Sequence, residues 1–427
     1  MDLAFLAQQR LSQLDKGIPN AVNELSIAEI KRQRWNLLQE DLPLPLAVVK
    51  KNALLRNSQW MQHFLVDTDA KLAPHGKTTM TPQLFQQQFN DGAWGITIAT
   101  LQQLKVCRIA GINQILLANQ LIGKQAIHYV YAELEQHQDF EFYCLVDSIA
   151  GVQQLAEIGK AYSRPLNVLI EVGYDNGRAG CRSLRQVLEL AQAIDKMSIA
   201  VQLVGIEGFE GNIHGKDNDD TEALVIDYLN FLVAAAESIL PYVKNDHLVL
   251  TAGGTAYYDL VKKIFSKIEL SKPILSLIRS GCYLLHDSNY YAQHFNRLKK
   301  RINYKEQTTP VEHAIEVWSY VQSLPQKDLA ILNFGKRDAS FDVAMPSPLF
   351  YYSPRKHQQP QALSSGYKIF KLDDQHAFLS TPNTSELKVG DMVACGVSHP
   401  CTTFDKWKWL PLVDDHYTVV DGLLTYF

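Results

Sequence analysis

The chain has 427 residues and a formal net charge of −4, with 46% hydrophobic and 20% charged residues. This composition is that of a folded globular protein and excludes an intrinsically disordered chain. The slight negative charge leaves no general basic field that would attract nucleic acid or an anionic membrane surface. The length allows two domains, or one large α/β domain with a smaller one attached.

The N-terminus and the cysteines indicate a cytoplasmic protein. The apolar run at residues 3–7 is too short for the core of a signal peptide, and no stretch stays apolar for the length of a membrane span. In a chain without a signal peptide, cysteines are expected to be reduced thiols rather than disulfides. The six cysteines are Cys107, Cys144, Cys181, Cys282, Cys395 and Cys401.

Residues 1–40 form a first segment that is polar and rich in Gln, Leu and Arg. We interpret this segment as helical and expect it to cover the outside of the following domain. A short apolar run at 46–49 comes next, and apolar residues with helical spacing follow at 52–64.

From Leu72 onward, short apolar runs alternate with longer segments of helical periodicity, such as 148–161, 184–196 and 222–242. Alternating strands and helices predict a parallel sheet, and eight such units predict an α/β fold built on a closed (β/α)8 barrel of the TIM type. An open, doubly wound sheet is the alternative for the same pattern. The eight runs are 71–75, 95–99, 114–118, 141–146, 167–172, 201–206, 247–251 and 274–279.

The alternation ends near Arg301, and the remaining chain predicts a C-terminal all-β domain. From Thr308 on, alternating apolar and polar residues with many aromatic residues are typical of short antiparallel strands. We therefore divide the chain into an N-terminal segment (1–40), a barrel (41–305) and a β-domain (306–427), which the run at 46–49 could join. Strands are expected at 312–320, 328–334, 367–372, 377–380 and 391–396.

Lys77 is the first candidate for chemistry. It follows the first run in Pro-His-Gly-Lys-Thr-Thr, and Pro82 then opens a helical pattern. A lysine at the end of a barrel strand can be desolvated, and a lowered pKa would make its amine nucleophilic toward an aldehyde. A phosphate-loop lysine is excluded because the required glycine five residues before Gly76 is Lys71. An ordinary loop charge is the remaining alternative.

Further candidates lie in the loops after other runs, and in such a barrel these loops share one face. Arg178 lies in a glycine-rich loop after run five, and Glu210 and His214 follow run six. Adjacent glycines and a threonine at a helix start expose N–H groups and a hydroxyl that suit a phosphate. The candidates of this kind are Gly253, Gly254 and Thr255 after run seven, and Ser280 and Gly281 after run eight.

Taken singly, these motifs have ordinary explanations, since Gly-Gly-Thr is commonly a turn and an arginine in a glycine loop is commonly a solvated charge. Their shared position is the evidence. A lysine that can form a Schiff base and a phosphate site on the same barrel face predict pyridoxal phosphate as the cofactor.

A candidate metal site lies in Ser-His-Pro-Cys-Thr-Thr-Phe-Asp-Lys-Trp near the C-terminus. His399 and Cys401 are two residues apart, so in an extended segment both side chains would lie on one face. An imidazole and a thiolate suit zinc, and few protein ligands with open positions suit a catalytic ion. A loop containing Pro400 and a buried thiol is the alternative, because His-x-Cys is a short and common pattern.

Four segments in this order resemble a known family: Pro-His-Gly-Lys-Thr, the loop of Arg178, Ala-Gly-Gly-Thr and His-Pro-Cys-Thr-Thr-Phe-Asp-Lys-Trp. Over about residues 40–427, the chain is similar to the D-serine dehydratase and D-threonine aldolase group, fold type III pyridoxal phosphate enzymes related to alanine racemase. The resemblance implies a barrel with a C-terminal β-domain. It also implies a homodimer in which the β-domain of one subunit closes over the barrel of the other.

The resemblance assigns roles to residues as well. Lys77 would bind the cofactor as a Schiff base and act as general base, and Arg178 would lie beside the phenolic oxygen of the cofactor. The motif departs at Phe209, where the family commonly has a tyrosine near the pyridine nitrogen, so no role passes to Phe209. The phosphate would be bound by Gly253, Gly254 and Thr255, with Gly281 and Cys282 on its other side, and a divalent metal, with zinc preferred, by His399 and Cys401.

These assignments imply a lyase for a β-hydroxy D-amino acid such as D-serine. Dehydration would give a 2-oxo acid and ammonia, whereas retro-aldol cleavage would give glycine and an aldehyde. A cysteine as second metal ligand, rather than a carboxylate, resembles the dehydratases more. An amino acid racemase is a further alternative because Tyr351, Tyr352 or Tyr417 could supply a second base, and a non-catalytic pyridoxal phosphate-binding protein is another.

Overall fold

A computed structural model describes residues 1–302 and 310–427. These residues form two compact units, one of residues 1–61, 78–87 and 282–427 and one of residues 62–77 and 88–281. The predicted boundary between barrel and β-domain, at residues 305 and 306, lies outside the described residues, as does the expected start of the β pattern at Thr308.

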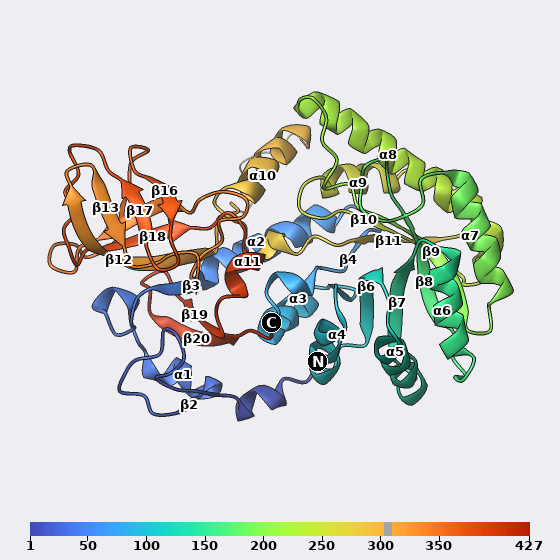
Figure 1. Ribbon diagram of the computed structural model, residues 1–427, viewed down its shortest axis with the longest axis horizontal. Helices are drawn as coiled ribbons and strands as arrows, with labels where there is room; N and C mark the ends of the chain where they lie inside the picture. The colour runs from blue at the N-terminus through green and yellow to red at the C-terminus, as the bar shows by residue number, and fades with distance from the viewer. Residues whose placement is uncertain (303–309) are drawn as a thin grey trace. The chain divides into compact units, whose positions relative to one another are not determined.

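The second unit contains eight parallel strands that form a barrel, as predicted (Figure 1). They are β4 (Lys71–Leu72), β5 (Ile96–Ile98), β6 (Gln114–Gln120), β7 (Glu141–Val146), β8 (Leu166–Val172), β9 (Val201–Gly208), β10 (Leu248–Ala252) and β11 (Ile274–Ile278). Neighbours pair in chain order from β5 to β11, and β11 pairs with β4. A parallel bridge between His75 and Thr97 joins the chain after β4 to β5, which closes the sheet and excludes the open alternative.

Helices separate these strands as the periodicity predicts. They are α3 (Pro82–Asn90), α4 (Leu101–Ile109), α5 (Lys124–Gln136), α6 (Ile149–Gly159), α7 (Leu184–Lys196), α8 (Asn218–Ser238) and α9 (Tyr258–Phe265). Thr100, Ser148, Ser183 and Asp217 cap α4, α6, α7 and α8 by accepting a backbone N–H with a side-chain oxygen. In Figure 1, α5 to α8 lie along the outside of the strands.

The interior of the barrel is filled by apolar side chains. One buried cluster joins residues of six strands, β6 to β11, and therefore lies inside the ring. A packed interior confines ligand chemistry to the loops at the strand ends. The cluster consists of Leu116, Tyr143, Leu145, Leu169, Val204, Val249 and Leu277.

The C-terminal chain forms an antiparallel β-domain in the first unit, as predicted. Its strands are β12 (Ile315–Gln326), β13 (Leu329–Leu332), β14 (Ser347–Tyr352), β15 (Gln361–Ala362), β16 (Lys368–Leu372), β17 (Ala377–Ser380), β18 (Met392–Gly396), β19 (Trp409–Val413) and β20 (Val419–Leu424). β3 (Leu46–Lys50) pairs with β12 and β19, which confirms that the run at 46–49 joins this domain. The sequence pattern misses β14, β15, β19 and β20. In β19, for example, four of five residues are buried, so no alternation marks the strand.

The prediction of a helical N-terminal segment is wrong for most of residues 1–40. The short 3-10 helices η1 (Ala4–Gln8) and η2 (Leu37–Gln39) flank the strand pair β1 (Arg10–Leu11) and β2 (Leu25–Ser26) and the single α-helix α1 (Ile27–Gln33). Gly17, with φ +86°, and Pro19 lie between β1 and β2, and both residues disfavour a continuous helix there.

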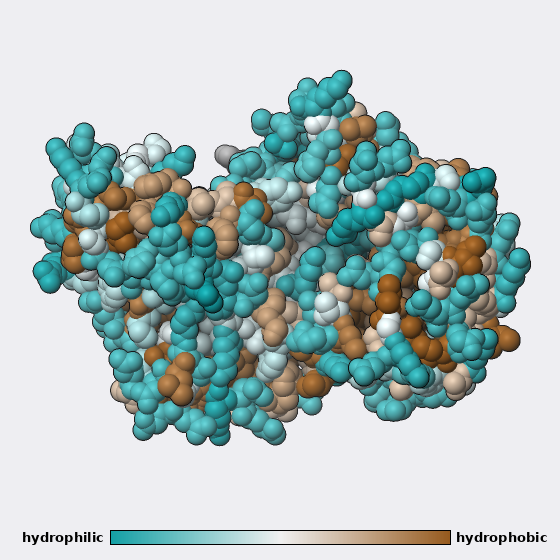
Figure 2. Space-filling view, viewed as in Figure 1, coloured by the Kyte–Doolittle hydropathy of each residue, from teal (hydrophilic) through white to brown (hydrophobic). Residues whose placement is uncertain are grey.

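The remaining α-helices are α2 (Lys51–Leu65), α10 (Tyr290–Arg301) and α11 (Cys401–Phe404). Within residues 1–302 and 310–427, no helix combines the length and the apolar character that crossing a membrane requires. Figure 2 shows hydrophilic residues over most of the face in view, with hydrophobic residues in small groups between them.

One buried carboxylate connects several strands of the β-domain. Glu316 in β12 is fully buried and accepts hydrogen bonds from Trp318 Nε1 at 2.9 Å and from the Tyr417 hydroxyl at 3.0 Å. Lys50 Nζ lies 3.1 Å from its other oxygen. Burial alone would raise the pKa of Glu316, but the hydrogen bond from His313 and the charge of Lys50 outweigh burial and lower the pKa to about 2.

We expect acid to remove the stabilisation that Glu316 provides. Because its folded-state pKa is depressed, this stabilisation is present above the unfolded pKa of about 4.5 and is lost as the pH falls toward about 2. A shift of this size corresponds to on the order of 3 kcal/mol. Glu316→Gln should lower the free energy of unfolding by a similar amount near neutral pH and flatten its dependence on acid. Urea unfolding across this pH range measures both, with the exposed Glu386→Gln as control, and the same acid dependence in Glu316→Gln and wild type would contradict the expectation.

A second prediction concerns the close approach of β9 to β10. A Cβ on Gly205 would lie 1.8 Å from the carbonyl oxygen of Val249, and a paired strand cannot move away without breaking its own hydrogen bonds. We expect Gly205→Ala to lower the free energy of unfolding by about 3 kcal/mol. Gly366→Ala, where the nearest atoms of Pro382 lie 3.5 Å away, is the control. Equal denaturant midpoints for the two variants would refute this account.

Candidate active site

Lys77 lies five residues after the end of β4, in the 3-10 turn η3 (Gly76–Thr78), and α3 then begins at Pro82 as expected. The N–H of His75 donates to the carbonyl oxygen of Arg279 at 3.2 Å, and the bridge from His75 to Thr97 fixes its other side. Neighbouring strands therefore set the start of the turn. The side chain of Lys77 is exposed.

Positive charge gathers around this turn. Burial lowers the pKa of His75 well below its usual range, and the charges of Lys77, Arg279 and Arg178 lower it further. His75 is therefore neutral at physiological pH, while three cations lie close enough to act on its ring. Glu171, Glu207 and Glu210 lie among these cations, and Glu207 pairs with Arg279, so the rim carries charges of both signs.

Arg178 and Phe209 connect two loops of this rim. Arg178 is exposed in the loop after β8, and its guanidinium carbon lies 5.2 Å from the centre of the Phe209 ring, a cation–π distance. The Phe209 N–H donates to the Tyr228 hydroxyl at 3.0 Å, which donates to the carbonyl oxygen of Val172 at 2.6 Å. Phe209 thus has a fixed backbone and a ring that supports Arg178, a contact that the sequence did not reveal.

The paired glycines after β10 bind a carboxylate of the protein. Gly253 and Gly254 donate their N–H groups to the two oxygens of Glu210, at 3.0 and 3.2 Å, and Glu210 is fully buried. The prediction that these residues open a helix is wrong, because α9 begins at Tyr258, three residues after the half-buried Thr255. The N–H groups have the arrangement that suits an anion, and a phosphate would compete with Glu210 for them. His214, in the same loop as Glu210, is exposed.

Arg279 and Glu207 are residues of this rim that the sequence analysis missed. The buried guanidinium of Arg279 contacts Glu207 at 2.5 Å, the Thr251 hydroxyl at 2.8 Å and the Gly208 carbonyl oxygen at 2.9 Å. Burial raises the pKa of Glu207 to about 7, although Arg279 opposes the rise. Arg279 Nε has no hydrogen-bond partner among residues 1–302 and 310–427. The signal in the sequence was an arginine that ends an otherwise apolar run.

The chain after β11 offers a further donor. Ser280 and Gly281 are buried, and the hydroxyl of Ser280 has no hydrogen-bond partner in the part of the chain that the structure describes. Cys282 begins the 3-10 turn η5 (Cys282–Leu284). A buried, unpaired hydroxyl at a strand end is available to a bound ligand.

The C-terminal motif is not the extended segment that we expected. Pro400 has helical φ and ψ and precedes α11, whose first residue is Cys401, so strand alternation does not place His399 and Cys401 on one face. His399 Nδ1 lies 2.6 Å from Asp342, and Cys401 Sγ lies 3.9 Å from Cys282 Sγ. Among all described residues, no three His, Cys, Asp or Glu side chains converge as a complete metal site would require.

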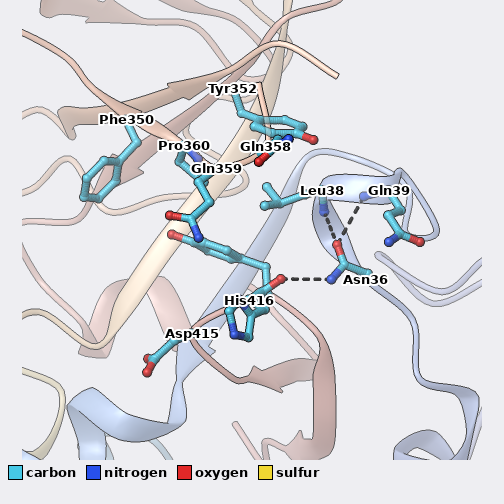
Figure 3. A pocket seen from close by; sticks show the side chains of 11 residues that line it. Asn36, Leu38, Gln39, Phe350, Tyr352, Gln358, Gln359, Pro360, Asp415 and His416 are labelled. Carbon is cyan, nitrogen blue, oxygen red and sulfur yellow. Dashed lines mark hydrogen bonds between the residues drawn. The ribbon is translucent and has the colours of Figure 1, made fainter. Parts of the chain in front are cut away.

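The candidate tyrosines of a racemase differ in their surroundings. Tyr417 donates to Glu316, and burial raises the pKa of Tyr417 far above its usual range. Tyr351 packs edge-on against His357. Tyr352 is buried and, like Asn36 and His416, lines a cavity of about 360 Å³ (Figure 3). None of the residues that we predicted for cofactor or metal binding lines this cavity.

Comparison with protein families identifies both parts of the chain. The alanine racemase N-terminal domain matches residues 49–262, half of the chain, and the putative serine dehydratase domain matches residues 314–413. The chain belongs to the alanine racemase-like family of the D-serine dehydratases and D-threonine aldolases. As a member of this family, it is a pyridoxal phosphate-dependent lyase.

Relatives of known activity resemble this lyase over lengths from one third of the chain to most of it. It is 22% identical over 362 residues to a D-threonine aldolase of Arthrobacter sp, covering 84% of this chain and 86% of the relative. It is 30% identical over 140 residues to the D-threo-3-hydroxyaspartate dehydratase of Delftia sp. (strain HT23), covering 33% and 36%. The crystal structure of D-threonine aldolase from Filomicrobium marinum superposes with a TM-score of 0.75 at 19% identity, covering 90% of this chain and 96% of that one, which confirms the fold.

The barrel rim of this lyase fits pyridoxal phosphate. The unpaired hydroxyl of Ser280 is a donor for a phosphate, and the N–H groups of Gly253 and Gly254 would become donors if a phosphate displaced the Glu210 carboxylate from them. A Cβ on Gly254 would lie 2.7 Å from the Phe209 ring, so a side chain at this position would displace that ring. Lys77 supplies a primary amine for the aldehyde of the cofactor, at the rim that also holds Arg178 and Arg279.

The contact between Phe209 and Arg178 predicts an effect on cofactor affinity. Phe209→Leu keeps an apolar side chain but removes the π face, so pyridoxal phosphate should bind about fivefold more weakly, the equivalent of about 1 kcal/mol. Phe209→Tyr keeps the π face and should bind like the wild type. Titration of the apoprotein, followed by absorbance, measures the affinity. In an Arg178→Ala background, Phe209→Leu should not weaken cofactor binding any further. If it still weakens binding about fivefold there, Phe209 does not act through Arg178.

Proposed function

We propose that this lyase is a metal-dependent D-amino acid dehydratase. Its substrate would be a β-hydroxy D-amino acid such as D-serine, and its products a 2-oxo acid and ammonia. The observation that carries the proposal is the position of Lys77, at a barrel rim with three cations and an anion-binding backbone, in a chain whose β-domain matches the putative serine dehydratase domain.

Lys77 is the catalytic base in this proposal. Its amine would hold the cofactor through the aldehyde, and as a free amine it would take the proton from Cα of the substrate. Pyridoxal phosphate supplies the electron sink for the electron pair that this leaves at Cα. Arg178, supported by Phe209, would face the phenolic oxygen. The phosphate would lie among Gly253, Gly254, Thr255, Gly281 and Cys282.

His399 and Cys401 are the metal ligands in this proposal. Hydroxide is a poor leaving group, and a divalent metal, with zinc preferred, would supply the Lewis acidity that its departure needs. A D-threo-3-hydroxyaspartate dehydratase has been solved as a histidine-to-alanine mutant and, with the cysteine two positions further on changed to alanine, in the metal-free form. The same His-x-Cys spacing here supports a metal at this motif and favours dehydration.

Retro-aldol cleavage is the second candidate reaction. It is supported by the similarity to the Arthrobacter D-threonine aldolase over 84% of this chain. The base would then take the proton of the substrate hydroxyl, and the Cα–Cβ bond would break. A racemase would need a second base, and the hydroxyl of Tyr417 is already bonded to Glu316. The homodimer and the cytoplasmic location stay predictions.

The test is release of 2-oxo acid by the full chain loaded with pyridoxal phosphate. D- and L-serine, D- and L-threonine and D-threo-3-hydroxyaspartate are compared, each before and after treatment with a chelator. We expect pyruvate from D-serine, its loss after chelation and its return with zinc. Lys77→Ala should reduce the rate by at least about a hundredfold, since a general base contributes this much or more. Lys71→Ala, an exposed lysine at the start of β4, is the matched control.

Other outcomes assign the enzyme differently. Glycine and an aldehyde from D-threonine would make it an aldolase with the same site. If the chelator does not change the turnover rate, the assignment of a catalytic metal to His399 and Cys401 is wrong. Inversion of configuration without 2-oxo acid would make it a racemase, and no reaction with any substrate would support a cofactor-binding protein.

A further inference from the structure

We propose that Asp342 is a positioning residue for His399, holding the imidazole in the tautomer that presents Nε2 to a divalent metal. The inference rests on the proposed function, because it takes His399 as a metal ligand. It goes beyond that proposal by naming the residue that fixes how the ligand is presented.

The contact between the two side chains is short and directed. His399 Nδ1 lies 2.6 Å from Asp342 Oδ2. An ionised carboxylate can only accept a hydrogen bond, so this contact requires the proton on Nδ1. In the neutral ring Nε2 then carries the lone pair, and Nε2 is the nitrogen left for a metal. Metal-binding histidines commonly donate their second ring N–H to a carboxylate in this way.

The carboxylate is itself held in place. Its other oxygen, Asp342 Oδ1, accepts a hydrogen bond from the Thr402 hydroxyl at 2.8 Å. Thr402 lies on the turn that contains both candidate metal ligands, so one carboxylate contacts this turn at two points. The arrangement fixes the rotation of the carboxylate and, through it, the plane of the imidazole.

The backbone on both sides is also tied together. The His399 N–H donates to the Ser340 hydroxyl at 3.1 Å, and the Ser340 N–H donates to the Thr403 hydroxyl at 3.0 Å. In the same two segments, the hydroxyl of Ser398, one residue before His399, donates to the carbonyl oxygen of Ala344 at 2.7 Å. Ser340, Thr403 and Ser398 are buried. Asp342 therefore extends from an anchored loop, residues 338–344, onto the residue that it orients.

A contribution to stability alone explains the pair poorly. The side chains of His399 and Asp342 are 33% and 44% exposed, and exposed ion pairs contribute little to stability. The buried hydrogen bonds of Ser340, Thr403 and Ser398 already join the two segments. The consequence specific to Asp342 is therefore the orientation and the tautomer of His399.

The test is the zinc affinity of the full chain, measured by competition with a chromophoric chelator. Asp342→Ala and Asp342→Leu should bind zinc about 10- to 100-fold more weakly than the wild type, the range typical of lost support for a metal ligand. Thr402→Val removes the other partner of the carboxylate and should keep most of the affinity. The thermal midpoint of the metal-free protein should be unchanged in all three variants, which separates orientation of His399 from a loss of structure.

His399→Ala distinguishes failure of this inference from failure of the proposed function. Weak zinc binding in His399→Ala with wild-type affinity in both Asp342 variants would overturn the role of Asp342 and leave the metal site standing. If His399→Ala binds zinc as tightly as the wild type, His399 is not a metal ligand, and the proposed role of Asp342 fails with it.

Discussion

Parallel pairing of the barrel strands is the constraint on which this site depends. Because every strand runs in the same direction, the loops after β4, β8, β9, β10 and β11 begin at one end of the barrel. Backbone pairing, rather than burial of its side chain, positions Lys77, since His75 is bonded to Arg279 and bridged to Thr97 just before it. An exposed amine with a fixed backbone can reach a ligand without first breaking contacts of its own.

Each compact unit also contains a buried charged group that connects several segments of the chain. Arg279 contacts Glu207, Thr251 and the carbonyl of Gly208, and so connects the ends of β9, β10 and β11. Glu316 forms an ion pair with Lys50 and accepts hydrogen bonds from Trp318 and Tyr417. Removing one partner of a buried pair leaves the other charge uncompensated, which costs several kcal/mol.

The rim shows how one aromatic residue can change the function of a loop. A phenylalanine at position 209 can neither donate nor accept a hydrogen bond, so it has no role of the kind that a tyrosine has toward a pyridine nitrogen. Its ring instead lies against Arg178 on one side and restricts Gly254 on the other. A position that looked like a lost contact in the sequence is a support for two predicted cofactor-binding residues.

The sequence alone determined the barrel, the separate β-domain and the family, because strand and helix periodicity and the Lys77 and His399 motifs are local patterns. The tertiary structure decided the rest. Asp342 meets His399 across 57 residues, and Arg279 meets Glu207 across 72, distances over which no pattern repeats. The hydrogen bonds from Gly253 and Gly254 to Glu210 could not be predicted from the sequence either, because only the barrel brings the loops after β9 and β10 together. The extended segment expected at His399 failed for a local reason, because Pro400 also suits the first turn of a helix.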